Sequence, residues 1–164
     1  MNDNCYYEQA LQFLHEIGIE TIFREIAHEQ SFLPGLLIEN GKIIIDKENL
    51  LYPGDLLHEA AHLAVIPASE RMEISGASIG KRKDAPAEEM MAIAWCYAAC
   101  MYLDIDPHFV FHEKGYKGEG ENIITNFREG RYFGVPVLEW LGMTNTKKEK
   151  DQPIYPAMIK WLRD

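Results

Sequence analysis

The sequence predicts an α+β fold in which a small antiparallel sheet packs against two buried helices. β-branched runs on both sides of Asn40-Gly41 predict a hairpin, because Asn-Gly is the turn that two-residue hairpins favour. Residues 55–64 are largely apolar good helix formers, and they contain a His-Glu-x-x-His motif. Residues 86–103 are apolar on nearly every side, which is typical of a buried helix.

Composition fits one compact unit. The chain has 164 residues, of which 47% are hydrophobic, so we expect a single domain over 1–164. Its core should lie at about 20–105, followed by a helical part over 106–164. The net charge of −10 argues against a nucleic-acid partner.

Location is predicted from what the sequence lacks. No apolar run approaches 18 residues, so we expect no membrane partner, and the polar N-terminus lacks the features of a signal peptide. Cys96 and Cys100 read as small buried hydrophobes in a reducing compartment. We therefore expect a cytoplasmic protein.

The segments before the motif are predicted in order. Apolar residues recur at helical spacing over 6–17, and Gly18 fits the end of that helix. Residues 19–26 suit either a helix or a strand. We favour a strand, since a hairpin alone is only marginally stable and needs a third strand.

The segments after the motif have weaker patterns. Residues 68–86 lack periodicity and read as a long loop, whose basic run 81–83 is either a solvated face or part of a substrate cleft. Residues 122–131 are a candidate helix, and 135–141 form a short apolar segment. We expect a terminal helix over 155–162, with Met158, Ile159 and Leu162 facing inward.

The His-Glu-x-x-His motif predicts a metal site. On a helix, His58 and His62 differ by about 40° in azimuth and one turn in height, so both rings can reach one cation. Glu59 can lean over the same site without binding the ion. Two neutral nitrogen donors and a nearby carboxylate suit Zn²⁺, with Glu59 as general base toward a water on the ion.

A third ligand is needed, because catalytic zinc sites usually have three protein ligands. No histidine follows closely after His62, so a glutamate from a neighbouring helix is the remaining route. Glu88 and Glu89 both lie at the start of the second buried helix. We favour Glu89, because Ala92 and Cys96 continue its face along the core. We expect the other glutamate to be a solvent-exposed carboxylate near the helix N-terminus.

Hydrolysis also needs a donor that stabilises the developing oxyanion. The sequence offers several tyrosines and histidines and does not choose among them. The candidates are Tyr97, His108, His112, Tyr116 and Tyr132.

Over roughly residues 20–105 the chain resembles the ImmA/IrrE family of zinc metallopeptidases, which have a zincin-like fold. The likeness rests on a short sheet, the His58–His62 motif and Glu89 at the head of an alanine- and aromatic-containing helix. Where thermolysin-like enzymes carry an aspartate four residues after the ligand, this chain has Ile93, so the partner that orients a ligand histidine is unidentified. The resemblance implies an intracellular peptidase, several relatives of which cleave a repressor or regulator.

Three functions are compatible with these observations. The first is a zinc metallopeptidase acting on a protein or peptide, with a regulatory protein among the candidate substrates. The second is a catalytically inactive zincin-like domain that binds a protein partner or senses metal. The third and weaker one is a metal hydrolase acting on a non-peptide amide. Glu59 favours an enzyme, because an inactive domain has little need of a carboxylate there.

Overall fold

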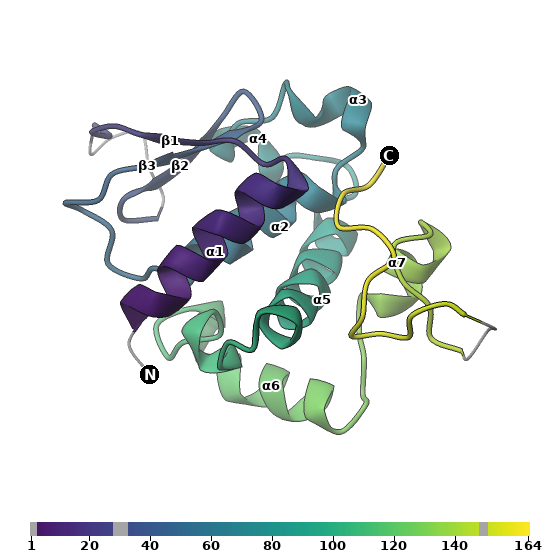
Figure 1. Cartoon of the computed structure of the whole chain (residues 1–164). Helices are drawn as coiled ribbons and strands as arrows, with labels where there is room; N and C mark the ends of the chain where they lie inside the picture. Colours follow the sequence, from purple (N-terminus) through teal and green to yellow (C-terminus); the bar gives the residue numbers. More distant parts are fainter. Residues whose placement is uncertain (1–2, 28–32, 148–150) are drawn as a thin grey trace.

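The fold is α+β, as predicted (Figure 1). A computed structural model describes residues 3–27, 33–147 and 151–164. Within these ranges the elements, in chain order, are α1 (Asp3–Ile17), β1 (Thr21–Phe23), β2 (Leu36–Glu39), β3 (Lys42–Ile45), α2 (Asp55–Val65), α3 (Ala68–Arg71), α4 (Gly76–Ile79), α5 (Ala85–Leu103), η1 (Pro107–Phe109), η2 (Tyr116–Gly118), α6 (Gly120–Arg128) and α7 (Val135–Trp140).

The sheet has the strand order β1-β3-β2. β2 and β3 form the predicted antiparallel hairpin, and both Asn40 and Gly41 have the positive φ that this turn requires. The prediction of an antiparallel sheet is wrong for β1, which pairs parallel to β3. The chain reverses direction between β1 and β2, so the hairpin turns β3 back into the direction of β1. The sheet is therefore mixed.

Helix α2 packs against β2, α1 and α5 (Figure 1). Both helices carry small, completely buried residues, and such residues let two helix backbones approach closely. They are Ala60, Ala61, Ala64, Ala92 and Ala99. Because the helices pack along their length, side chains on facing turns of α2 and α5 are brought together.

Two predictions of local structure are wrong. The loop expected over 68–86 contains the short helices α3 and α4. Residues 155–162 do not form a helix, because their backbone donors bond to distant carbonyls: the Tyr155 N–H donates to Asn145 O and the Ile159 N–H to Met143 O. Pro156 also lacks the N–H that a helix uses. The terminal segment is instead held by tertiary contacts.

Parts of this segment nonetheless pack against the core: Tyr155 is buried, and Met158, Trp161 and Leu162 are partly buried. Ile159, which was expected to face inward, is exposed. Trp161 stacks edge-on against Trp95 and Phe13, and its carbonyl accepts the Trp95 indole N–H at 2.9 Å. The candidate helix over 122–131 is present as α6, and the short apolar segment 135–141 forms helix α7. Cys96 and Cys100 are free and buried, as expected.

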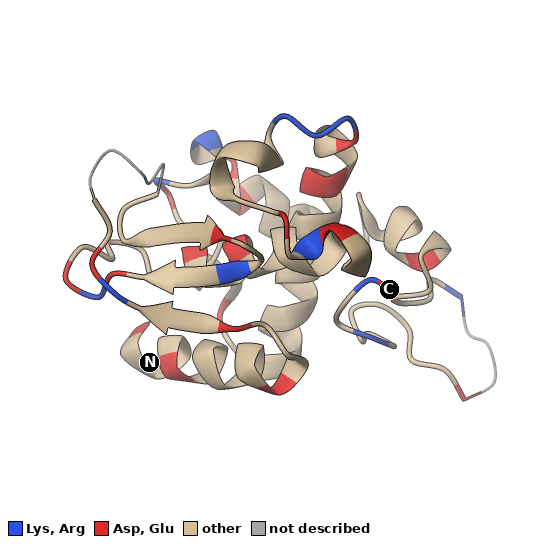
Figure 2. Cartoon of the chain, turned by 90° about the horizontal axis from the view of Figure 1, so that it is seen from above, with Lys and Arg blue, Asp and Glu red and all other residues tan. Residues whose placement is uncertain are grey.

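Charges of both signs are interspersed over the helices, strands and loops (Figure 2). Acidic residues outnumber basic ones, 26 to 16. Among the described residues, no helix combines the length and apolar character that crossing a bilayer requires.

Substitution of Gly54, at the start of α2, tests the fold. An added Cβ would lie 1.7 Å from the Phe109 carbonyl oxygen, which belongs to backbone. We expect Gly54→Ala to lower the free energy of unfolding by at least about 2 kcal/mol in urea denaturation, since overpacking forces the backbone to move. The control is Gly80→Ala, where a Cβ meets nothing within 4 Å and φ is negative. Equal effects of the two substitutions would contradict the close approach of α2 to η1.

Candidate metal centre

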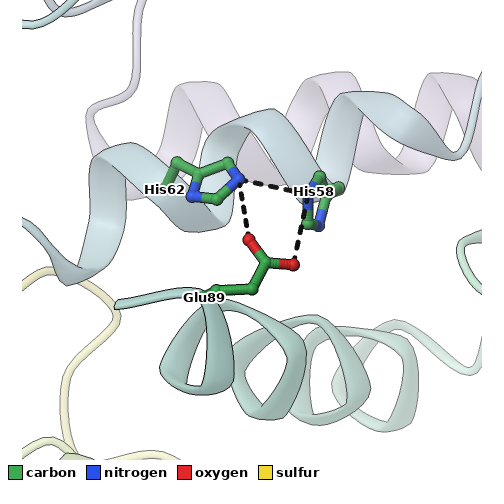
Figure 3. Close-up of side chains that lie close together, drawn as sticks. All are labelled: His58, His62 and Glu89. Atoms are coloured by element: carbon green, nitrogen blue, oxygen red, sulfur yellow. Dashed lines mark hydrogen bonds and ion pairs between the residues drawn. The ribbon is translucent and has the colours of Figure 1, made fainter. Parts of the chain in front are cut away.

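His58 and His62 lie one helical turn apart along α2, on the side that faces α5 (Figure 3). Their Nε2 atoms are 3.1 Å apart, and the ring planes are nearly perpendicular at 77°. The helical spacing of four residues produces this approach directly. Both imidazoles are therefore aimed at one point.

Glu89 approaches the two rings from the first turns of α5 (Figure 3). One carboxylate oxygen lies 3.4 Å from His62 Nε2, and the other lies 3.9 Å from His58 Nε2. The side chain is 44% exposed, whereas the histidine side chains are 17% and 10% exposed. The structure thus brings the three sequence-predicted ligands together at the junction of two helices.

These distances fit a zinc ion. In a tetrahedral site with bonds of about 2.0–2.1 Å, donor atoms lie about 3.3 Å apart. The three potential ligand atoms lie within 4.8 Å of one another. Two imidazole nitrogens and one carboxylate are also the donor set of a catalytic zinc site, which leaves a fourth position open.

Both histidines are neutral near pH 7, which is the form of imidazole that binds a metal ion. Burial lowers the pKa of His58 to about 3, helped by repulsion from His62 and His112. Burial likewise lowers the pKa of His62 to about 4, although the nearby Glu88 opposes the shift. Near pH 7, proton competition at these nitrogens is therefore weak.

The pKa values of the carboxyl groups at the site are raised. Burial raises the pKa of Glu59 to about 8, and the negative charges of Asp55 and Glu89 add to the shift. Burial also raises the pKa of Glu89. A raised pKa means that the ionised carboxylate is poorly stabilised by its surroundings. A divalent cation bound nearby would stabilise the ionised form.

Glu88 is not the solvent-exposed carboxylate that we expected. Its side chain is only 4% exposed, and Arg82 binds both of its oxygens at 2.8 and 2.9 Å. Arg82 also contacts Glu70 at 2.9 Å. The guanidinium therefore pairs with both Glu88 oxygens, while Glu89 faces the histidines. The flanking residues of the basic run, Lys81 and Lys83, are exposed.

Tyr116 and His112 are the oxyanion-donor candidates with a recorded contact to the motif helix. The Tyr116 hydroxyl lies 2.8 Å from His58 Nδ1. His112 Nε2 lies 2.9 Å from an Asp55 carboxylate oxygen, one turn before His58, and its ring stacks on Tyr52.

The remaining candidates are engaged elsewhere. Tyr97 packs its ring against Phe127, and Tyr132 packs against Tyr155. His108 is half-exposed, with its two ring nitrogens near Asp106 and Glu121.

Sequence reasoning missed two residues near the site. Asp55 begins α2, and its buried carboxyl group contacts His112, while burial raises its pKa. Arg82 was read as part of a basic run, yet it forms the ion pair that sets Glu88 apart from Glu89. No local pattern signals either contact, because each joins segments that only the tertiary structure brings together.

Comparisons of the chain with models of known protein families, with curated proteins and with solved structures gave no match. The assignment of a function therefore rests on the residues and geometry described above.

The pKa of Glu59 yields a stability test on metal-free protein. A carboxyl group whose folded pKa is raised stabilises the fold below its unfolded pKa of 4.5, and that stability is lost as the pH rises toward about 8. Because glutamine does not ionise, Glu59→Gln removes this pH-dependent loss of stability. We expect the variant to gain stability relative to the wild type between pH 5 and pH 8, by up to about 1.4 kcal/mol per pH unit.

Urea denaturation at several pH values in the presence of a chelator measures this difference. The control is Glu8→Gln on α1, where the side chain is exposed and the difference from wild type should not vary with pH in this way. A Glu59→Gln difference that is the same at pH 5 and pH 8 would refute the burial of an ionisable carboxyl group here.

Proposed function

We propose that this protein is a zinc-dependent metallopeptidase, with His58, His62 and Glu89 as metal ligands and Glu59 as general base. The observation that carries the proposal is the convergence of three side chains: the two Nε2 atoms are 3.1 Å apart, and the two Glu89 oxygens lie 3.4 Å from His62 Nε2 and 3.9 Å from His58 Nε2. Beside them is the Glu59 carboxyl group, whose pKa is raised to about 8. The resemblance to the ImmA/IrrE family supports it and adds an intracellular location and a regulatory protein as the substrate to be tested.

The residues of the chain divide the work of hydrolysis. A zinc ion bound here would acidify a coordinated water and polarise the scissile carbonyl. Glu59 accepts a proton from the attacking water and then donates it to the leaving amine nitrogen, which suits a group whose pKa lies near the working pH. His58 and His62 stay neutral throughout, because their pKa values are far below 7.

An oxyanion donor completes the proposed site. Tyr116 is engaged with His58 Nδ1, which leaves His112 as the candidate in contact with α2. The contact of His112 with Asp55 uses Nε2, and Nδ1 is buried, so a neutral His112 ring that donates to Asp55 has no second N–H for an oxyanion. We therefore leave the oxyanion donor unassigned, a role in which a single donor is typically worth about 3 kcal/mol of transition-state stabilisation.

Glu59 separates the enzyme from the inactive alternative. A domain that only binds a partner or senses metal would need the three ligands, and a buried carboxyl group beside them would only destabilise it. We therefore place the non-catalytic domain second, and the hydrolysis of a non-peptide amide third.

Two substitutions distinguish metal binding from catalysis. We expect Glu59→Gln to keep about one zinc per chain and to lose hydrolysis by about 100-fold or more, since it removes the proton carrier and no ligand. Glu89→Ala should lose both, because it removes a ligand. Zinc content is measured by elemental analysis after dialysis, and hydrolysis by mass spectrometry of a proteome-derived peptide library.

Glu8→Gln is the control for both readouts, since it changes an exposed glutamate on α1. Normal hydrolysis by Glu59→Gln would disprove the role of Glu59 as base. Unchanged zinc content in Glu89→Ala would disprove the ligand set.

A further inference from the structure

The turn that carries Tyr116 has an uncommon backbone. Tyr116, Lys117 and Gly118 are three consecutive residues with positive φ, at 51°, 56° and 82°. Glycine adopts this left-handed conformation freely, but a non-glycine residue adopts it only at a steric cost to its Cβ. A conformation of this cost persists only where surrounding contacts fix it, and such residues cluster at functional sites.

What the turn positions is the Tyr116 side chain. Its hydroxyl oxygen lies 2.8 Å from His58 Nδ1, on the opposite side of the imidazole from the proposed cation. The two rings meet edge to face at 81°, with centroids 5.2 Å apart. Phe111 packs against the Tyr116 ring with a centroid distance of 5.0 Å. The hydroxyl is therefore held against His58 by ring packing as well as by its backbone.

This contact bears on which nitrogen of His58 carries the hydrogen. A neutral imidazole has one N–H and one lone pair, on different nitrogens. If Nδ1–H donates to the Tyr116 oxygen, Nε2 keeps its lone pair and can bind a cation. The Tyr116 hydroxyl must then donate elsewhere.

Cys96 offers that onward acceptor. Its thiol and the Tyr116 side chain interact, so the sulfur is placed to accept from the Tyr116 hydroxyl. The sulfur also lies 3.5 Å from the Leu57 carbonyl oxygen, to which the S–H can donate. This arrangement allows the hydrogen bonds to run in one direction from His58, through Tyr116 and Cys96, to the backbone of α2.

We propose that Tyr116 is a positioning residue that fixes His58 in the Nδ1–H form, with its Nε2 lone pair aimed at the cation site. The inference rests on the proposed zinc site and supplies the orienting partner that the sequence left unidentified. Partners of ligand histidines typically change metal affinity by about 10- to 100-fold when they are removed.

Tyr116→Phe tests this role, because it keeps the ring against Phe111 and removes only the hydroxyl. We expect its zinc affinity at pH 7, measured by competition with a chromophoric chelator, to fall by about 10- to 100-fold. The matched control is Tyr97→Phe, which removes a hydroxyl from a buried ring that packs on Phe127. Its zinc affinity should equal that of the wild type.

A second readout separates orientation from packing. In metal-free wild-type protein, ¹⁵N NMR of the His58 side chain should show hydrogen on Nδ1, and in Tyr116→Phe the population should shift toward hydrogen on Nε2. A purely structural role for Tyr116 would not move this signature.

The outcomes are distinguishable. If the wild type binds zinc and Tyr116→Phe binds it equally well, the positioning role is wrong and the metal site stands. Hydrogen on Nε2 of His58 in the metal-free wild type would also overturn the inference, whether or not the variant folds. If the wild type binds no zinc, both the proposed function and this inference fail.

Discussion

The packing of α2 against α5 is the constraint on which the site depends. His58 and His62 lie on one helix and Glu89 on the other, so their donor atoms meet only if the helix axes are close. The completely buried alanines on both helices allow this approach. A larger side chain in that seam would separate the helices, and a shift of about 1 Å is enough to impair a site of this kind.

Electrostatics gives the same junction a second constraint. Two imidazoles are kept neutral by burial, while Glu59 and Glu89 have raised pKa values. Buried carboxyl groups without a cation lower the stability of the fold, and a dication between the ligands would offset that cost. Of the adjacent Glu88 and Glu89, Arg82 provides such compensation for Glu88. Glu88 thus has a protein counter-ion, whereas Glu89 has no recorded Lys or Arg partner among the described contacts.

Local sequence patterns predicted the elements that build the site. The spacing of apolar residues located α1, α2 and α5, and Asn40-Gly41 located the hairpin, because helical period and turn geometry are local properties. The parallel pairing of β1 and the non-helical path of 155–162 depend on distant partners, namely β3 and the carbonyls of Asn145 and Met143. The same reason explains the site: His58, Glu59 and His62 follow from one helical turn, whereas the contacts of Arg82 and Tyr116 span separate segments.

The central claim is that His58, His62 and Glu89 bind one zinc ion. Crystals of protein grown with zinc, with diffraction data collected on both sides of the zinc absorption edge, test it most directly. The account predicts one anomalous peak about 2.0–2.1 Å from each of the two Nε2 atoms and from a Glu89 oxygen. No peak between these residues, or a well-occupied peak only at other residues, would contradict it.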